Sequence, residues 1–159
     1  MFEQPLKDYT YNNTKVSEFK PPEDYYPDGL PEGVYFFEGW YTTPECYPDT
    51  KVNFDTLEMP NGDLTLYANW APIELKVNLY PSYEDYDAGT NQIGETIKVA
   101  YNNKVVPVPD EPTNTVSKDY EFVGWFYMEN GEEKAFDFAN MPVTKNLNVY
   151  AKWSSNVLI

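Results

Sequence analysis

Apolar and polar residues alternate along much of this chain, and the alternation predicts β-strands. In the segment 73–80, Ile, Leu, Val and Leu alternate with Glu, Lys, Asn and Tyr. The segments 64–70 and 147–153 alternate in the same way, and both end in Trp. Strict alternation places one face of a strand against a core and the other face toward water. Three further strands are predicted by their β-branched and aromatic content, at 34–42, 97–101 and 120–127.

A sequence duplication organises most of the chain into two modules. The first copy holds Phe-Glu-Gly-Trp-Tyr at 37–41, Asn-Phe-Asp at 53–55, Met-Pro at 59–60 and Leu-Thr-Leu-Tyr-Ala-Asn-Trp at 64–70. The second copy holds Phe-Val-Gly-Trp-Phe at 122–126, Ala-Phe-Asp at 135–137, Met-Pro at 141–142 and Leu-Asn-Val-Tyr-Ala-Lys-Trp at 147–153. Matched positions lie 82 to 85 residues apart. Self-similarity of this kind indicates two structural units of one design.

We expect each module to contain four strands and a short helical turn, which makes the fold mainly β with an α+β character. The helical turn is placed at the Phe-Asp…Met-Pro stretch, because the Pro ends any helix that begins there. The expected boundaries are 1–71 for the first module, 72–153 for the second and 154–159 for a tail. The second module is complete, whereas the first has no counterpart of the strand at 73–80.

The missing strand predicts an open sheet edge in the first module. Ahead of its predicted strand at 9–16, the first module has only residues 2–6, where Pro5 cannot donate to a ladder. Unpaired edges recruit other strands. We expect the edge to be filled by the tail 157–159 of a neighbouring chain or by an improvised pairing of residues 2–6. The first module should therefore be the less stable one and a source of weak self-association.

Composition excludes several classes of function. The chain has 26 acidic and 11 basic residues, all of them Lys, and a net charge of −15. Without His or Arg it lacks the usual catalytic triads, a His-based zinc site and bidentate phosphate clamps. Its negative charge repels nucleic acid and anionic membranes. An aromatic content of 18% nevertheless supplies the apolar surface for packed cores, so the chain is not wholly disordered.

Neither a disulfide nor a membrane segment is indicated by the sequence. Cys46 is the single cysteine, and its acidic neighbours favour an ordinary loop residue over an activated nucleophile. No apolar run approaches the roughly 18 residues of a membrane span, and residues 1–5 do not resemble a signal peptide. We therefore expect any export signal to lie outside this sequence.

The string Gly-Trp-Tyr/Phe, Phe-Asp, Met-Pro and Leu-x-Val/Leu-Tyr-Ala-x-Trp resembles the Listeria–Bacteroides repeat, also called the internalin B-repeat. The resemblance covers nearly the whole chain, once in part and once in full. It implies a compact, ubiquitin-like β-grasp fold, so the chain would be two tandem β-grasp modules. It also implies a secreted or wall-attached bacterial surface protein, in which such modules are spacer, adhesive or host-contact units without catalytic residues.

The recurring signature residues are expected to form the cores of the two modules. They are Gly39, Trp40, Phe54, Met59 and Trp70 in the first module, and Gly124, Trp125, Phe136, Met141 and Trp153 in the second. A buried Trp adds a large apolar area to a small domain. An exposed sugar-binding platform is the alternative interpretation of the four Trp residues.

Three tyrosines, Tyr80, Tyr83 and Tyr86, form the preferred partner-contact site. They lie in the segment 80–87, which joins the first two strands of the second module. Surface Tyr gives a large contact area at a low entropic cost. The alternative is a hairpin loop whose Tyr rings lie on their own sheet.

Acidic loops are typical of turns here rather than of metal or catalytic sites. The oxygen-rich candidates for calcium are Asp85, Asp87 and Asn91 in one loop and Asn61 and Asp63 in another. Neither loop has the spacing of an EF-hand. The adjacent acids are Glu23-Asp24, Glu84-Asp85 and Glu132-Glu133. Glycosidases need two carboxylates that face each other, one with a raised pKa, so we expect no metal, no cofactor and no catalysis.

The sequence as a whole favours a non-enzymatic repeat segment of an extracellular or cell-surface bacterial protein, which acts as a spacer and as a surface for protein interaction or adhesion. Its partner would be a host or bacterial surface protein or a glycan, with no nucleic acid and no membrane insertion. A specific carbohydrate- or mucin-binding domain is the first alternative and requires exposed, coplanar aromatic residues. A diverged hydrolase is the second and requires a deep cleft with converging carboxylates.

Overall fold

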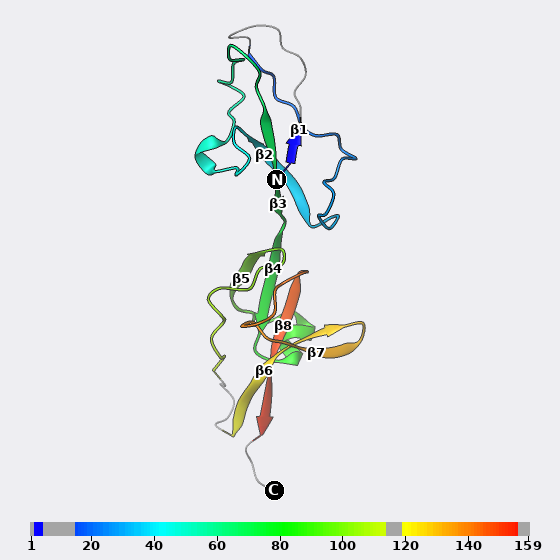
Figure 1. Cartoon of the computed structure of the whole chain (residues 1–159). Helices are drawn as coiled ribbons and strands as arrows, with labels where there is room; N and C mark the ends of the chain where they lie inside the picture. The colour runs from blue at the N-terminus through cyan, green and yellow to red at the C-terminus, as the bar shows by residue number, and fades with distance from the viewer. Residues whose placement is uncertain (1, 5–14, 114–118, 156–159) are drawn as a thin grey trace. The chain divides into compact units, whose positions relative to one another are not determined.

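The computed structural model describes residues 2–4, 15–113 and 119–155, and Figure 1 shows the elements of each part. The chain divides into two compact units, Met1–Ile73 (unit 1) and Glu74–Ile159 (unit 2). Each unit holds one β-sheet, and the α-helix found among the described residues lies in unit 2. The fold is therefore mainly β, as the alternation of the sequence predicts.

Unit 1 is built on a three-stranded antiparallel sheet. Its elements are β1 (Phe2–Gln4), β2 (Tyr35–Tyr41), a 3-10 turn η1 (Pro48–Thr50) and β3 (Leu66–Pro72). The strand order is β1-β3-β2, so β3 is central. An improvised N-terminal pairing is confirmed for residues 2–4, which run antiparallel to 66–68. Residues 5 and 6, and most of the strand predicted at 9–16, lie outside the described residues.

The core of unit 1 is built from β2, β3 and the loops that pack on them. Trp40, Leu66 and Ala68 are buried at its centre. The partly buried apolar residues around them are Phe19, Phe37, Val52, Phe54, Leu57, Leu64 and Trp70. The indole nitrogen of Trp40 donates to the carbonyl of Phe19 at 2.8 Å. This bond fastens the chain ahead of β2 to the core.

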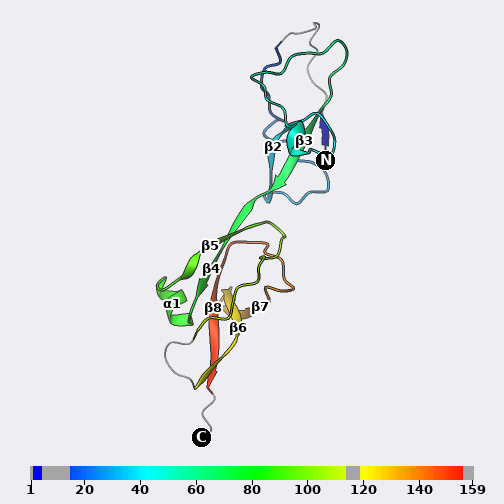
Figure 2. The ribbon, with the colours of Figure 1, turned by 90° about the vertical axis from the view of Figure 1, so that its left-hand side faces the viewer.

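Unit 2 has a larger, five-stranded sheet in the order β5-β4-β8-β6-β7. β4 and β8 run parallel at its centre, and the other neighbouring pairs are antiparallel. Helix α1 packs beside β8 and β4, as Figure 2 shows. The elements are β4 (Glu74–Tyr80), α1 (Tyr83–Ala88), β5 (Ile93–Ala100), β6 (Tyr120–Glu129), β7 (Glu132–Phe136) and β8 (Leu147–Ser155).

The central strands of unit 2 are deeply buried. On β4, the alternation works as expected, because Leu75, Val77 and Leu79 are all at most 6% exposed. On β8, Val149 is fully buried on one face, and Tyr150, on the opposite face, is only 1% exposed. At Tyr150 the second face of β8 is covered by the rings of Tyr83 and Tyr86 from α1, whereas Asn148 and Lys152 on that face stay exposed.

The predicted helical turns are present only as single turns. The backbone N–H of Leu57 donates to the Asn53 carbonyl at 2.9 Å, and that of Met141 donates to the Asp137 carbonyl at 2.8 Å. Asn53 and Asp137 also accept from the N–H two residues on through their side chains. Such local bonds compete with helix growth, and a Pro follows within three residues of each turn, so neither continues into a helix.

The prediction of four strands per module is wrong for unit 2. Residues 132–136, expected as part of a loop and turn, form the fifth strand, β7. The two-residue loop Asn130-Gly131 joins β6 to β7 and has positive φ at both positions, 52° and 78°. Asn-Gly is a strong hairpin signal. The Asn-Gly loop determines the pairing of β7 with β6, although the β7 sequence, Glu-Glu-Lys-Ala-Phe, has little strand propensity of its own.

The position of the helix is also corrected by the structure. The sequence pattern predicts a loop between strands at 80–87, but Tyr83–Ala88 form helix α1. The hydroxyl of Ser82 caps the helix by accepting from the Asp85 N–H at 3.2 Å. Gly89 ends it in the left-handed conformation, at φ 68°. Both residues are standard capping choices, so the sequence carries a signal for this helix.

The duplication recurs in the backbone of both sheets. β2 pairs with β3, and β6 with β8, in antiparallel register. Each pairing has a β-bulge just before the signature glycine, between Phe37 and Gly39 and between Phe122 and Gly124. A bulge bends its strand and re-aims one side chain. The side chain at the bulge differs between the units: it is Glu38 in unit 1 and the exposed Val123 in unit 2.

The aromatic packing is repeated as well. The ring of Phe37 lies 5.2 Å from that of Trp40 and 5.9 Å from that of Trp70. The counterparts in unit 2 are Phe122 to Trp125 at 5.3 Å and Phe122 to Trp153 at 5.8 Å. All four contacts are T-shaped, the geometry that aromatic pairs prefer. The two units therefore share one core design.

Candidate interaction site

The three tyrosines of the predicted contact site gather around a fourth ring, Tyr150 on β8. The centroids of Tyr83 and Tyr86 lie 5.3 and 5.2 Å from that of Tyr150, and Tyr80 lies 6.1 Å from Tyr86. Tyr80 and Tyr150 are buried, Tyr86 is half-buried, and Tyr83 is 45% exposed. Most of the cluster thus lies on its own sheet. Tyr83 is the member with the most surface open to a partner.

A hollow of about 1020 Å³ lies beside this cluster, within unit 2. Its apolar walls are Pro81, Tyr83, Ile93, Pro112, Tyr120, Tyr150, Ala151 and Trp153. Its polar residues are Ser82, Glu84, Asp85, Asn91, Thr113, Glu133 and Lys152. Broad apolar walls with a few placed polar groups are typical of binding pockets.

Glu133 is held at the polar side of this hollow. Its carboxylate accepts hydrogen bonds from the Tyr150 hydroxyl and the Lys152 ammonium. The bond from Lys152, with that from Tyr150, lowers the pKa of Glu133. Burial and the bond to Glu133 raise the pKa of Tyr150. At neutral pH the hollow therefore presents an ionised carboxylate that is already paired with a cation.

Asp85 is held by its own loop. Its carboxylate accepts from the side chains of Asn91 at 2.8 Å, Ser82 at 3.1 Å and Thr90 at 3.1 Å. The hydrogen bond from Asn91, followed by the others, lowers the pKa of Asp85. Asp85 and Glu133 line one hollow, but a glycosidase acid needs a raised pKa. Where the structure describes the chain, no group of three or more His, Cys, Asp or Glu could hold a metal ion.

The signature residues differ in their burial. Trp40, Met59, Trp125 and Phe136 are buried, while Phe54, Trp70 and Trp153 are half-buried. Met141 is 36% exposed, which corrects its assignment to the core. Its sulfur accepts the backbone N–H of Asp137 at 3.3 Å, and this contact holds it on the surface of the turn. At Gly39, a Cβ would approach the Lys51 side chain to 2.9 Å, so a side chain there would displace Lys51.

Trp153 has a specific role at the edge of the hollow. Its indole nitrogen donates to the carbonyl of Pro81, the residue that directly follows β4, at 2.8 Å. The bond ties the end of β8 to the end of β4. Trp70, its counterpart in unit 1, packs against Tyr25 and Tyr26 at 6.0 and 5.4 Å. These rings line a smaller hollow of about 270 Å³.

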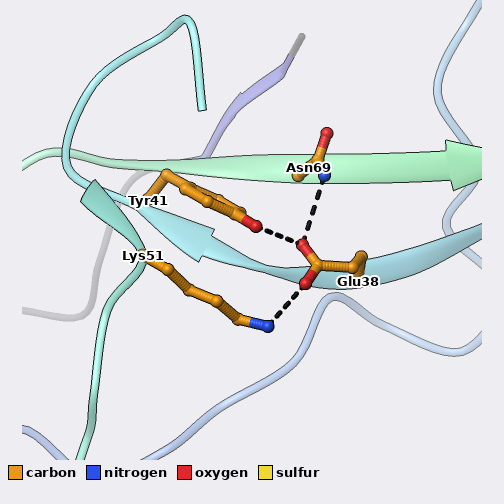
Figure 3. A network of polar contacts seen from close by, with 4 residues as sticks. All are labelled: Glu38, Tyr41, Lys51 and Asn69. Atoms are coloured by element: carbon orange, nitrogen blue, oxygen red, sulfur yellow. Dashed lines mark hydrogen bonds and ion pairs between the residues drawn. The ribbon is translucent and has the colours of Figure 1, made fainter. Parts of the chain in front are cut away.

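Unit 1 carries its own polar network on β2 and β3, shown in Figure 3. The carboxylate of Glu38 accepts from the Tyr41 hydroxyl at 2.6 Å and the Asn69 amide at 3.2 Å, and it pairs with Lys51. Burial alone would raise the pKa of Glu38, but the bonds from Lys51, Tyr41 and Asn69 outweigh it, so the pKa is lowered. Burial, with the bond to Glu38, raises the pKa of Tyr41 to about 12.

Cys46 lies in the loop after β2, in a left-handed conformation at φ 52°. It is half-buried. Burial raises the pKa of its thiol, and the carboxylates of Glu38 and Glu45 raise it further. A raised thiol pKa leaves little thiolate at neutral pH, which is the opposite of an activated nucleophile.

Several residues of the hollow in unit 2 are not predicted by the sequence pattern. Tyr120, Tyr150 and Glu133 reach it from β6, β8 and β7, and Pro112 from the loop ahead of β6. One signal points to Tyr150. It occupies the polar face of an alternating strand, between Asn148 and Lys152, and a large ring on that face indicates a covering element. No pattern in the sequence indicates that the other residues meet.

Comparison with known proteins finds one repeat in each half of the chain. The Listeria-Bacteroides repeat domain matches residues 8–69 and 82–152. Internalin H of Listeria monocytogenes is 33% identical over 124 residues, which is 77% of this chain and 20% of that protein. A protein of Evansella cellulosilytica named "Putative Gly-rich membrane protein" is 32% identical over 145 residues, which is 91% of this chain and 14% of that protein. No solved structure matches the chain significantly.

The chain spans a fifth or less of the length of these relatives. No helix among the described residues has the length and apolar character that a membrane crossing needs. The two family matches together cover most of the sequence, and each ends within the last strand of its unit. The chain therefore belongs to the Listeria-Bacteroides repeat domain family and contains two copies of the repeat.

Proposed function

We propose that this chain is a non-enzymatic pair of repeat modules in a bacterial surface protein, where it serves as a spacer and offers a contact surface to a host or bacterial surface protein. Membership in the repeat family and the similarity to internalin H support this proposal. The repeated core also supports it, because a module that recurs with the same packing suits a structural role. The surrounding protein would be extracellular or attached to the cell surface.

We further propose that each unit is a version of the β-grasp fold. In unit 2 the first and last strands, β4 and β8, pair in parallel at the centre of a mixed sheet with antiparallel strands on both sides. This is the sheet arrangement of a β-grasp. Helix α1 packs on the same central strands, although it lies between β4 and β5 in the sequence. Unit 1 would be the same design without its opening strand.

The observation that carries the contact role is the aromatic hollow of unit 2. Tyr83 and Tyr120, which both line it, are 45% and 44% exposed. Exposed Tyr residues beside desolvated ring clusters are typical of interaction hot spots. The negative charge of the chain would favour a partner with basic residues at the rim of its contact surface.

Binding of labelled chain to epithelial cell monolayers tests the contact role. We expect Tyr83→Ala and Tyr120→Ala to reduce bound label at least fivefold. Tyr47→Ala is the matched control, since Tyr47 is 58% exposed but belongs to unit 1. Circular dichroism must show that all three variants are folded. Equal binding by all variants would contradict the assignment of the hollow.

A specific carbohydrate-binding function is the second candidate. It is favoured by the arrangement of Tyr83, Tyr120 and Trp153 around one hollow. A glycan array distinguishes the two proposals. Binding to defined sugars that is lost in Tyr83→Ala supports the carbohydrate function, whereas cell binding that persists after deglycosylation of the cells supports a protein partner.

A further inference from the structure

The last strand of each repeat accepts a strand from outside that repeat. The repeats as matched, 8–69 and 82–152, include neither β1 nor β4. Even so, β1 pairs with β3 in unit 1, and β4 pairs with β8 in unit 2. In each sheet this pairing uses the edge opposite β2 or β6. The same edge of two equivalent strands is thus filled in two different ways.

In unit 2 the edge is filled by a long parallel strand. Four successive residues, Val77 to Tyr80, pair with Leu147 to Tyr150. β4 brings three buried apolar side chains to the core, at 75, 77 and 79. Directly after β4, the Pro81 carbonyl accepts the indole N–H of Trp153. The accepted strand therefore contributes backbone pairing, core packing and a terminal hydrogen bond.

Among the described residues of unit 1, the same edge is filled much less completely. β1 supplies three residues, which run antiparallel to 66–68. Leu64 and Thr65, the counterparts of Leu147 and Asn148, precede β3 and are not in a strand. The indole nitrogen of Trp70 is buried and has no hydrogen-bond acceptor within the described residues. A buried donor without an acceptor is rare and destabilising, so it marks the place where a partner group belongs.

We propose that the β3 edge of unit 1 is an acceptor for a parallel strand of the β4 type, which replaces β1 there. The strand would carry apolar residues at alternate positions and end in a Pro whose carbonyl accepts from the Trp70 indole N–H. Its source would be the segment that follows the last strand of a neighbouring repeat, because β4 itself directly follows β3. This inference goes beyond the proposed contact function, and either can fail without the other.

A synthetic peptide with the sequence of residues 73–82 tests the proposal on the full chain. The corresponding edge of β8 is occupied by β4 along four residues. The partly filled edge of β3, from which the peptide would displace β1, is therefore the expected acceptor. We expect saturating peptide to shift the NMR signal of the Trp70 indole N–H and to slow its exchange with water. The amides of residues 64–66 should exchange at least tenfold more slowly. A control peptide with Asn in place of the residues corresponding to Val77 and Leu79 should do neither.

The direction of the bound strand is a sharper test. A nitroxide label at the C-terminus of the peptide should broaden the Trp70 signal, and a label at its N-terminus should not. Trp70→Phe should weaken peptide binding about threefold to tenfold, the usual effect of one neutral hydrogen bond, while Trp153→Phe should leave it unchanged. The reverse broadening pattern, signals that move only in unit 2, or no change at millimolar peptide would overturn the proposal.

Self-association gives a further arm of this test. If sedimentation shows that the chain forms dimers, added peptide should dissociate them, because both would compete for one edge. Dimers that persist while the Trp70 indole signal stays unshifted in excess peptide would contradict the proposal, whereas dimers that persist after that signal has shifted must use another surface.

Discussion

Unit 1 and unit 2 carry the same aromatic core but differ in what completes it. In unit 2, β4 runs through the centre of the sheet and buries Leu75, Val77 and Leu79. In unit 1, the corresponding edge holds the three residues of β1. The repeated residues therefore determine the pairing of β2 with β3 and of β6 with β8. How completely each core is filled depends on a strand outside the repeat.

The polar networks differ between the units in the same region. In unit 1, a glutamate at the bulge of β2 binds Tyr41, Lys51 and Asn69. In unit 2, the bulge holds an exposed valine, and the glutamate comes from β7 to bind Tyr150 and Lys152. The two units thus share the aromatic packing of the core but differ in the polar side chains on the outer face of the sheet. This is the pattern expected of repeats that share a scaffold and differ in their surfaces.

The largest expected effect is that of removing the signature Trp of either core. Trp40 and Trp125 are 2% and 7% exposed, so replacement of either by Ala should lower the free energy of unfolding of its unit by about 3–5 kcal/mol. Because a small unit has little stability in excess, Trp40→Ala should unfold unit 1 at room temperature. NMR spectra of the two variants check this. If both variants keep the folded spectrum of their unit, the two tryptophans do not hold the cores together.

The next effect concerns the contribution of β4. Val77→Ala removes a fully buried side chain, and we expect it to cost unit 2 about 2 kcal/mol, with no effect on unit 1. Lys76→Ala on the same strand is the matched control and should change the stability of unit 2 by less than about 0.5 kcal/mol. Urea unfolding followed by signals of each unit measures both. A loss of stability in unit 1 would mean that the two units do not unfold independently.

A smaller effect should separate the two half-buried tryptophans. Trp153→Phe removes the bond to the Pro81 carbonyl, whereas Trp70→Phe removes an indole N–H that has no acceptor among the described residues. Both variants lose similar apolar area. We therefore expect Trp153→Phe to be the more destabilising by about 1 kcal/mol. Equal losses in urea unfolding would show that Trp70 does not differ from its counterpart.

The smallest effect is the pH dependence of the Glu38 network. A carboxyl whose pKa is lowered by folding stabilises the fold above its unfolded pKa, and this stability is lost as the pH falls through the folded pKa. Unit 1 should therefore weaken below about pH 4.5. Tyr41 acts at the other end, because its raised pKa means that stability is lost as the pH rises from 10 to about 12.

Glu38→Gln tests this network directly. It should lower the stability of unit 1 at pH 7 by about 1 kcal/mol or less and flatten its dependence on pH in acid. Glu32→Gln is the matched control, because Glu32 is an exposed glutamate of the same unit. Urea unfolding midpoints of the wild type and both variants, measured from pH 7 to pH 3, give the pH dependence of the stability of unit 1. The same slope in wild type and Glu38→Gln would remove the network from the account.

Much of the fold could be predicted from the sequence because alternation reports directly on burial. Alternation locates β3, β4 and β8, and the duplication relates the two units through their matched residues alone. The pattern fails where local chemistry sets the structure. The charged β7 is recruited by its Asn-Gly loop, and α1 depends on its caps at Ser82 and Gly89. The hollow could not be predicted, because its residues meet only through sheet order and the packing of α1.

The indole of Trp70, which lacks an acceptor in the described part of the chain, shows a second limit. In the sequence, Trp70 and Trp153 occupy equivalent positions and have the same local pattern. Their difference lies in the strand that runs beside them, which is outside the repeat in both units. Whether the indole N–H finds an acceptor is set by the neighbouring segment, so it cannot be predicted from the Trp and its immediate sequence neighbours.

Native-state hydrogen exchange of the full chain, measured in dilute monomer, can show whether unit 1 is the less complete unit. The amides of β8 should exchange at least tenfold more slowly than those of β3, because β4 covers one edge of β8 along four successive residues. The amides of residues 64 and 65 should be among the fastest to exchange in the segments 64–70 and 147–153. Equal protection of 64–70 and 147–153 would contradict the account.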